Sequence, residues 1–326
     1  MKLKNRASCT ACGACLAVCP KDAIAMEEDR CGYLYPKIDG TKCVSCGLCE
    51  RLCNGAEEKR LPLQAFAAVG TEDHLTENSA SGGVFAALAK SCMERGGSAA
   101  GAVMEFSAAG LRVRHILSDR MDGLRQMQGS KYVQSEAWHC YEAVRSALKE
   151  GKTVLFSGTP CQVAAVQKLT GSPEHLITAD LICHGVPPQK MLRDYTKILS
   201  KRFWGRLTGF SFRDKSRDKE FCARLEFKNR HCYLPSSALS FYALFLKGSI
   251  YRENCYACPY ASFERIADLT MGDYWGIEDV HREDFAKGTM PARKDWSCLL
   301  VNTEKGQRFL REHGAQLRLF PTQTDW

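Results

Sequence analysis

Cysteines at repeated spacings are the residues of this chain best suited to chemistry. Residues 9 to 20 read CTACGACLAVCP, residues 43 to 53 read CVSCGLCERLC, and both runs have the spacing Cys-x2-Cys-x2-Cys-x3-Cys. Three closely spaced thiolates can bind three corners of one [4Fe–4S] cluster, while the fourth cysteine of each run reaches the other cluster. The spacing therefore predicts two clusters, one held by Cys9, Cys12, Cys15 and Cys53 and the other by Cys43, Cys46, Cys49 and Cys19.

A pair of zinc knuckles is the alternative for these cysteines, but a zinc ion takes four ligands, usually from two pairs. The repeated run of four, with Pro20 after the first, favours clusters and one-electron transfer. Gly13 and Gly47 let backbone amides approach the sulfurs. The segment resembles the bacterial two-cluster ferredoxins, and it departs from them at Asn54, where a second proline is usual. Cys31 is expected to be a spare thiol.

Four later cysteines stand in turn contexts and predict a third cluster. They are Cys161 in SGTPCQ, Cys183 in CHGVP, and Cys255 and Cys258 in NCYACPY. Cys161 as a nucleophile with His184 as its base is one alternative, a buried structural cysteine is another, and zinc is a rival for the Cys255-x2-Cys258 pair. The remaining cysteines lie within strand or helix patterns and are expected in the core: Cys92, Cys140, Cys222, Cys232 and Cys298.

The elements that must position these cysteines alternate between strand and helix after a linker over residues 55–62. The patterns predict strands over 63–70, 98–106, 111–117, 152–158 and 175–185, and helices within 79–97, 138–150, 162–169 and 188–199. Short turns between them imply parallel pairing with right-handed crossovers, and a mixed sheet in the less regular later part. Cys161 and Cys183 then lie at the carboxyl edge of the sheet, where open α/β sheets bind ligands. The helix beginning at Cys161 should favour its thiolate.

Composition limits the possible partners. The 326 residues carry 18 cysteines and a net charge of +8, with the positive residues scattered rather than grouped. Anionic clusters and a bound diphosphate would offset that charge, so no nucleic-acid partner is expected. The start of the chain does not have the pattern of a signal sequence. The longest apolar run, 237–251, is interrupted by Lys247 and Gly248, so no membrane span is expected. We therefore expect a cytoplasmic protein with reduced cysteines.

Six ordered motifs resemble one family. They are SASGGVF (79–85), GSKYVQS (129–135), SGTPCQ (157–162), CHGVP (183–187), CYACPY (255–260) and ADLTMGDYWG (267–276). The chain resembles the beta subunit of coenzyme F420 hydrogenase and dehydrogenase, in the longer form with an amino-terminal two-cluster ferredoxin segment. The resemblance implies FAD, a [4Fe–4S] cluster in the body, and electron exchange with a deazaflavin. Relatives of this family reduce tetrapyrroles instead.

The resemblance also implies residues that contact FAD. Ser81, Gly82 and Gly83 precede a helix and offer backbone N–H groups to a diphosphate. Lys131 would pair with a phosphate or with the N1/O2 edge of the flavin, and His184 would relay protons, although a structural histidine is an equal alternative. The other expected contacts are Gly129, Ser130, Tyr132, Gln134, Ser135, Gly158 and Thr159. Asp268, Asp273 and Trp275 are expected to shape the surroundings without a proton role.

The sequence thus predicts an α/β protein, α+β overall. A small ferredoxin-like domain over 1–57 precedes a larger mixed-sheet domain over 58–326 that binds FAD and a [4Fe–4S] cluster. The predicted function is an iron–sulfur flavoprotein oxidoreductase, with ferredoxin or another electron carrier as one partner and a deazaflavin or small organic molecule as the other. The alternatives are an electron-relay subunit of a larger redox complex, a reductase of a tetrapyrrole or biosynthetic intermediate, and a Cys161 hydrolase or transferase. A homo-oligomer or a redox-complex partner is the corresponding expectation for assembly.

Overall fold

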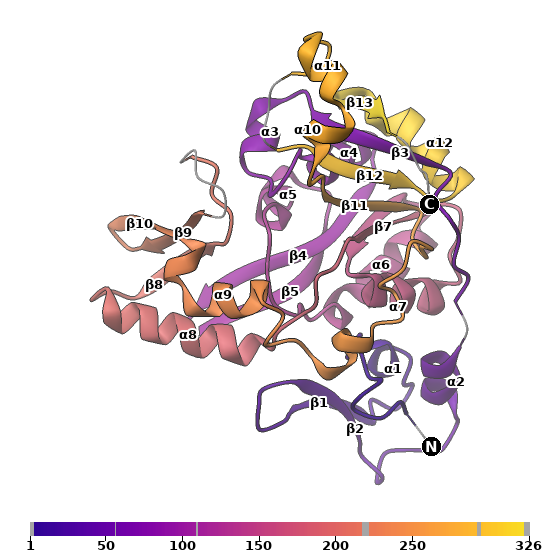
Figure 1. Cartoon of the computed structure of the whole chain (residues 1–326). Helices are drawn as coiled ribbons and strands as arrows, with labels where there is room; N and C mark the ends of the chain where they lie inside the picture. The colour runs from indigo at the N-terminus through magenta and orange to yellow at the C-terminus, as the bar shows by residue number, and fades with distance from the viewer. Residues whose placement is uncertain (1–2, 56, 109, 217–221, 292–294, 323–326) are drawn as a thin grey trace.

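The computed structural model describes residues 3–55, 57–108, 110–216, 222–291 and 295–322. The amino-terminal segment forms an antiparallel hairpin of β1 (Ile24–Glu28) and β2 (Leu34–Ile38), flanked by α1 (Ala14–Ala17) and α2 (Leu48–Asn54). Figure 1 shows this segment at the bottom of the molecule, beneath the helices of a larger body. The predicted domain boundary after residue 57 stays a prediction, and contacts cross it: Lys168 and Tyr260 both donate hydrogen bonds to the Glu57 carboxylate.

The body is built on an eight-stranded mixed sheet. Its strands lie in the order β13 (Leu317–Pro321), β3 (Gln64–Gly70), β12 (Ser297–Val301), β11 (Leu269–Asp273), β7 (Leu176–Leu181), β6 (Val154–Gly158), β4 (Ser98–Ser107) and β5 (Gly110–Ser118). Neighbours among β11, β7, β6 and β4 pair in parallel, whereas the outer pairs are antiparallel. The mixed α/β fold predicted from the sequence is confirmed.

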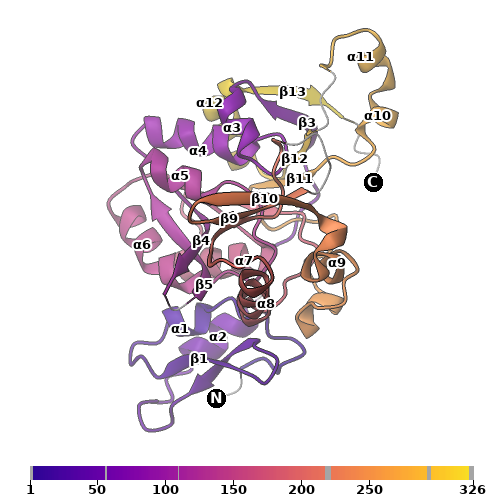
Figure 2. The ribbon, with the colours of Figure 1, turned by 90° about the vertical axis from the view of Figure 1, so that its left-hand side faces the viewer.

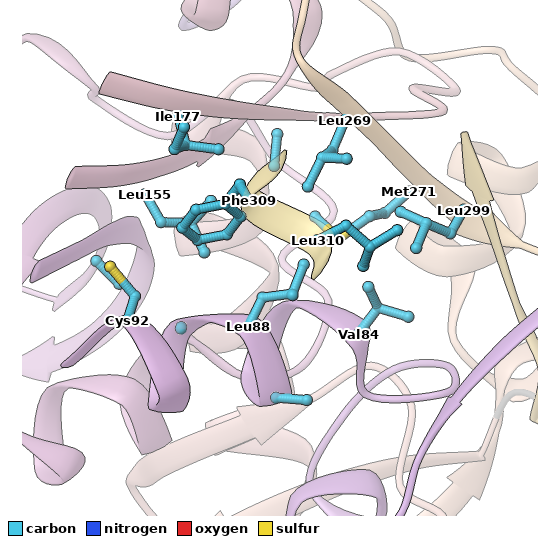
Figure 3. Close-up of a cluster of buried hydrophobic side chains, with 14 of the residues drawn as sticks. Val84, Leu88, Cys92, Leu155, Ile177, Leu269, Met271, Leu299, Phe309 and Leu310 are labelled. Atoms are coloured by element: carbon cyan, nitrogen blue, oxygen red, sulfur yellow. The ribbon is translucent and has the colours of Figure 1, made fainter. Parts of the chain in front are cut away.

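Helices cover both faces of this sheet because successive strand residues point to opposite sides. Leu155 and Ile177 pack on one face with α4 (Val84–Glu94), α5 (Met121–Met127) and α12 (Glu304–His313). Figure 3 shows this core, with Leu88 of α4 facing Phe309 and Leu310 of α12. Phe156 packs on the other face with α6 (Trp138–Lys149) and α7 (Pro160–Thr170).

A second, three-stranded sheet lies beside the body. It consists of β10 (Arg230–Pro235), β9 (Cys222–Phe227) and β8 (Leu207–Ser211), and it shares a core with α8 (Gln189–Arg202), α9 (Ser240–Leu246) and the residues Leu111 and Val113 of β5. Figure 2 shows β9 and β10 crossing in front of the large sheet. The remaining elements are short: α3 (Asp73–Glu77), α10 (Ile277–Val280), α11 (Arg282–Ala286), and the 3-10 helices η1 (Ser236–Ala238), η2 (Glu253–Ala257) and η3 (Gly314–Gln316).

The longest apolar run of the sequence is part of this second core. Residues 237–251 contain α9, whose Phe241, Tyr242 and Phe245 side chains are buried. Throughout the described ranges, no helix has the length and apolar character that crossing a bilayer requires.

Candidate functional site

The two cysteine runs adopt the same backbone conformation. Ala11 and Ser45, 34 residues apart in the chain, have φ angles of 48° and 53°. Gly13 and Gly47 have φ angles of 77° and 75° and precede α1 and α2. A left-handed conformation at a non-glycine residue is uncommon, so its recurrence at equivalent positions shows that the sequence repeat is also a structural repeat.

The thiols predicted to hold the first cluster line one cavity. We call them the first thiol set: Cys9, Cys12, Cys15 and Cys53. The Ala11 N–H donates a hydrogen bond to Cys9 Sγ at 3.4 Å. Burial raises the pKa of the Cys9 thiol, an effect that this amide opposes. The same cavity is also lined by Cys161, so the first thiol set adjoins the corner where α7 begins.

The thiols predicted to hold the second cluster line a separate cavity. This second thiol set consists of Cys19, Cys43, Cys46 and Cys49. The Ala23 N–H donates a hydrogen bond to Cys19 Sγ at 3.3 Å, so this set, like the first, has a sulfur that accepts from a backbone amide. Burial raises the pKa of the Cys49 thiol, and nearby Cys19 and Cys46 raise it further. Backbone amides aimed at sulfur stabilise thiolates and iron-bound sulfur.

Cys161 lies in the first turn of α7, at the corner that the sequence predicted. Strand β6 ends at Gly158, and Thr159 caps the helix with Gln162 in a reciprocal capping box. Thr159 Oγ1 lies 3.1 Å from Cys161 Sγ. The Gln162 amide group also donates to the Ser135 carbonyl and hydroxyl oxygens. The predicted contact residues Thr159 and Ser135 are therefore both tied to this corner.

The parallel pairing of β6 with β7 places Cys161 and Cys183 at the same edge of the sheet. Gly158 lies opposite Asp180, and β7 ends at Leu181 rather than at residue 185, which leaves Cys183 in the turn beyond the strand. Cys183 and Cys255 both act on the pKa of Cys161, and Cys255 and Cys258 act on that of Cys183. The third thiol set is Cys161, Cys183, Cys255 and Cys258.

Desolvation governs the acidity of these thiols. Burial raises the pKa of Cys161 well above its ordinary value, although the Thr159 hydroxyl lowers it. Surrounding protein likewise raises the pKa of Cys183 to about 12, although part of its side chain reaches solvent. The helix N-terminus therefore does not make Cys161 a free thiolate, and a coordinated metal is the agent that deprotonates such a thiol. Among the described residues, no group of three or more His, Cys, Asp or Glu side chains is placed to hold a single metal ion.

His184 is oriented away from a role as the base of Cys161. Its Nε2 contacts the Leu246 carbonyl oxygen at 3.3 Å, and its ring packs edge-on against Phe245 and Tyr251. Among the described contacts, none joins His184 to Cys161. The geometry gives no support to a nucleophile and base at this corner.

The GSKYVQS motif serves several structural roles. Gly129 has a φ angle of 78°, and the following Ser130 is half-buried. The Lys131 ammonium donates to the carbonyl oxygens of Gln126, Met127 and Gln128 at the end of α5. Its three N–H donors are thus in use, while desolvation lowers the pKa of Lys131 to about 7. Tyr132 stacks on Phe245 with ring centroids 4.4 Å apart.

The Ser-Gly-Gly turn lies at the same edge of the sheet as the third thiol set. A Cβ atom on Gly82 would lie 2.5 Å from the Ala68 carbonyl oxygen of β3, and the Gly82 N–H donates to Ser297 Oγ at the start of β12. Ser81 Oγ donates to the Trp296 carbonyl oxygen at 2.9 Å. Gly83, with a φ angle of 78°, caps α4. The first N–H groups of α4, rather than that of Gly82, are left for an anion.

Two aspartates of the ADLTMGDYWG motif are held in hydrogen-bond networks. The Asp268 carboxylate accepts from the Thr178 N–H at 2.8 Å and from the Thr303 hydroxyl at 2.8 Å, which ties β7 to α12. Asp273 accepts two hydrogen bonds of 2.7 Å from Arg213. The Trp275 side chain of the same motif is 61% exposed.

Sequence reasoning missed the residues that connect the amino-terminal segment to the body. Gln134 donates to the carbonyl oxygens of Thr10 and Ala11 beside the first thiol set, and its expected contact with FAD stays a prediction. The Tyr141 hydroxyl donates to the Cys12 carbonyl oxygen at 2.8 Å. Arg252 reaches the Cys9 and Leu34 carbonyl oxygens. The one feature of the sequence that could have indicated such a contact was the position of Arg252, three residues before Cys255.

The cysteine-lined cavities and the mixed α/β body define an iron–sulfur redox protein. Residues 8–55 match the model of the 4Fe-4S dicluster domain, and residues 151–322 match that of the C terminus of the coenzyme F420 hydrogenase/dehydrogenase beta subunit. The second match covers more than half of the chain, which therefore belongs to this hydrogenase and dehydrogenase family, as its motifs predicted. The family is one of oxidoreductases.

Individual relatives are more distant. Over 48 residues, the chain is 48% identical to one subunit of the Na(+)-translocating ferredoxin:NAD(+) oxidoreductase complex of Acetobacterium woodii, covering 15% of this chain and 13% of that protein. It is 24% identical over 202 residues to an uncharacterized protein of Methanocaldococcus jannaschii, covering 52% and 54%. The chain thus matches at most about half the length of either relative.

One solved structure supports the fold. It is a chain of the F420-reducing [NiFe] hydrogenase complex of Methanosarcina barkeri, with a TM-score of 0.52 and 15% sequence identity over 82% of this chain and 85% of that one. At this identity the likeness concerns the fold alone.

The buried His115 next to this corner predicts how stability depends on pH. Its Nε2–H donates to the Ser157 carbonyl oxygen at 3.0 Å, and burial lowers the pKa of His115 to about 4. The unfolded chain binds a proton near pH 6.5, so folding stability falls as the pH drops below that value. Between pH 7 and pH 5, wild type should lose about 2 kcal/mol more free energy of unfolding than His115→Gln.

Denaturant titrations of both proteins at several pH values check this expectation. The exposed His74 supplies a matched control variant, His74→Gln. Parallel pH profiles for wild type and His115→Gln would contradict it.

Proposed function

We propose that the chain is an iron–sulfur flavoprotein oxidoreductase. It would pass electrons between [4Fe–4S] clusters and a two-electron organic substrate or deazaflavin through FAD. When bound, the clusters exchange single electrons and the flavin exchanges one or two, which joins one-electron carriers to hydride chemistry. The observation that carries this proposal is the adjacency of the thiol sets, because one cavity is lined by the first thiol set and by Cys161 of the third.

The donor chemistry of each set fits a [4Fe–4S] cluster. Every set offers four thiols, and Cys9 and Cys19 each also receive a backbone N–H. Cys53 is the last cysteine of the second run but lies with the first set, and Cys19, the last of the first run, lies with the second, as the two-cluster pattern requires. The thiols of the third set are supplied by the turns after β6 and β7 and by the η2 segment.

Iron content tests the third thiol set. Three clusters correspond to about twelve irons per chain, and Cys161→Ala is expected to lower this to about eight because one cluster loses a ligand. Iron and acid-labile sulfide are measured after anaerobic purification. The exposed Cys31 provides the matched control Cys31→Ala, which should keep about twelve. Twelve irons in Cys161→Ala would exclude the assignment.

The sheet register supports a flavin between the Ser-Gly-Gly turn and the third thiol set. Met271 pairs with Leu181, Asp273 with Ser297, and Ser297 with Ala68. The ends of β3, β11, β7 and β6 therefore share one edge with the start of α4. The first N–H groups of α4 would hold the diphosphate, since helix N-termini bind anions. Gly158 and Thr159 would then lie beside the flavin, next to Cys161.

A charge at position 81 tests this placement. Ser81→Asp puts a carboxylate beside the proposed diphosphate, and like-charge repulsion should raise the Kd for FAD at least tenfold, or about 1.4 kcal/mol. Ser81→Ala is the matched control, because it removes only the hydrogen bond to the Trp296 carbonyl oxygen. Binding is followed by quenching of FAD fluorescence. Equal Kd values for the two variants would rule out a diphosphate at this turn.

A relay subunit is the second candidate function. The structural neighbour is part of a hydrogenase complex, and one relative belongs to a ferredoxin:NAD(+) oxidoreductase complex. For a self-sufficient oxidoreductase we expect the purified chain alone to reduce a deazaflavin or another small organic acceptor, such as a tetrapyrrole or biosynthetic intermediate, with dithionite or reduced ferredoxin as donor. Absence of turnover together with a co-purifying partner in native mass spectrometry would favour the relay.

A further inference from the structure

Arg252 is a buried cation between two of the thiol sets. Among the fully buried side chains in the described part of the chain, that of Arg252 is the largest, with 1% of its surface exposed. Its carbonyl oxygen accepts from the Cys255 N–H at 2.8 Å, and its own N–H donates to the Val186 carbonyl oxygen at 3.0 Å. The backbone of Arg252 therefore belongs to the segment that supplies the third thiol set.

The side chain of Arg252 extends to the first thiol set. Its guanidinium donates to Gln134 Oε1 at 3.0 Å, to the Leu34 carbonyl oxygen at 2.9 Å and to the Cys9 carbonyl oxygen at 3.5 Å. It also lies 4.7 Å from the ring centroid of Tyr35. Each of these partners is neutral.

A comparison with Arg265 shows what Arg252 lacks. Arg265 is also buried, and it forms a 2.9 Å ion pair with Asp180. Among the described residues, no carboxylate forms an ion pair with Arg252. A buried charge without an opposite charge is strongly unfavourable. The Tyr33 and Tyr35 rings lie against the Arg252 guanidinium, and burial raises the pKa of both phenols. The other nearby groups able to become anionic are cysteine thiols: the guanidinium donates to the Cys9 carbonyl oxygen, and the Arg252 carbonyl oxygen accepts from the Cys255 N–H.

We propose that Arg252 is the shared counter-charge of the first and third thiol sets and that it sets the reduction potentials of the clusters they hold. This inference rests on the proposed function. Reduction adds one electron to a cluster and makes it one unit more negative, so a fixed adjacent cation favours the reduced form. The electron comes from a low-potential donor, and no proton is exchanged at Arg252 because its guanidinium stays protonated.

The geometry also explains the choice of arginine. One planar guanidinium donates to three acceptors on the amino-terminal segment and the body, which a lysine ammonium could not reach in the same fork. Gln134 connects the same parts, since it accepts from Arg252 and donates to the Thr10 carbonyl oxygen. Arg252 is therefore a positioning residue as well as a charge, and the two roles need separate variants.

Redox titration of the whole chain, followed by low-temperature electron paramagnetic resonance, tests the proposal. Arg252→Gln removes the charge and should lower the equilibrium constant for one-electron reduction at least tenfold at two clusters, a shift of about 59 mV per tenfold. The cluster of the second thiol set should keep its midpoint. Arg252→Lys keeps the charge, so the midpoint potentials of its clusters should stay near those of wild type. Arg193→Gln, which removes a 2.8 Å ion pair with Glu28, is the control.

The outcomes decide between charge and packing. Unchanged midpoints in Arg252→Gln, or equal lowering in the lysine and glutamine variants, would overturn the proposal. If Arg252→Gln loses iron, an iron-replete Arg252→Lys with wild-type midpoints supports it, and loss of iron from both variants overturns it. About eight irons in wild type would remove the third cluster from the proposed function. A shift at the first cluster would then limit the role of Arg252 to the counter-charge of that cluster, and the absence of a shift would overturn it.

Discussion

The register of the large sheet is the constraint on which the site depends. Parallel strands β6, β7 and β11 end together, and β3 ends beside the start of β12 at the same edge. A slip of one residue would turn every side chain of a strand to the opposite face. It would also move Cys161 relative to Cys183. The buried cores on both faces fix the register, so the packing of Leu155 and Phe156 on opposite faces positions the turns that carry the thiols.

Local patterns in the sequence predicted much of this arrangement. The repeated cysteine runs, the helix that begins at Pro160, and the parallel pairing of the strands before Cys161 and Cys183 all involve residues near one another in the chain. Apolar periodicity likewise located α4, α6, α7 and α8. Strand β7 is shorter than predicted because its pairing with β6 ends at Asp180 and its pairing with β11 ends at Leu181.

Contacts distant in the sequence could not be predicted in this way. The antiparallel strands β12 and β13 flank β3, more than 200 residues earlier, and nothing local in β3 indicates these partners. The hydrogen bonds from Gln134 and Tyr141 to the amino-terminal loop have no sequence pattern, because both donate to backbone carbonyl oxygens, which every residue offers. Motif resemblance assigned Gln134 to a cofactor, which stays a prediction, and it gave no sign of the contacts between Gln134 and the amino-terminal loop.

These interface contacts join the loop of the first thiol set to the body. The loop between Cys9 and Cys12 is held by Gln134 and Tyr141, and a Cβ atom on Gly13 would lie 2.6 Å from Trp138. The body therefore positions the first thiol set itself, rather than only adjoining a finished domain. Electron transfer between neighbouring centres requires a fixed separation. Hydrogen bonds to the backbone of the loop that carries the thiols fix this separation directly, whereas surface contacts elsewhere in the segment would fix it only indirectly. The structural repeat supplies two similar thiol sets, and the first of them lines a cavity shared with Cys161.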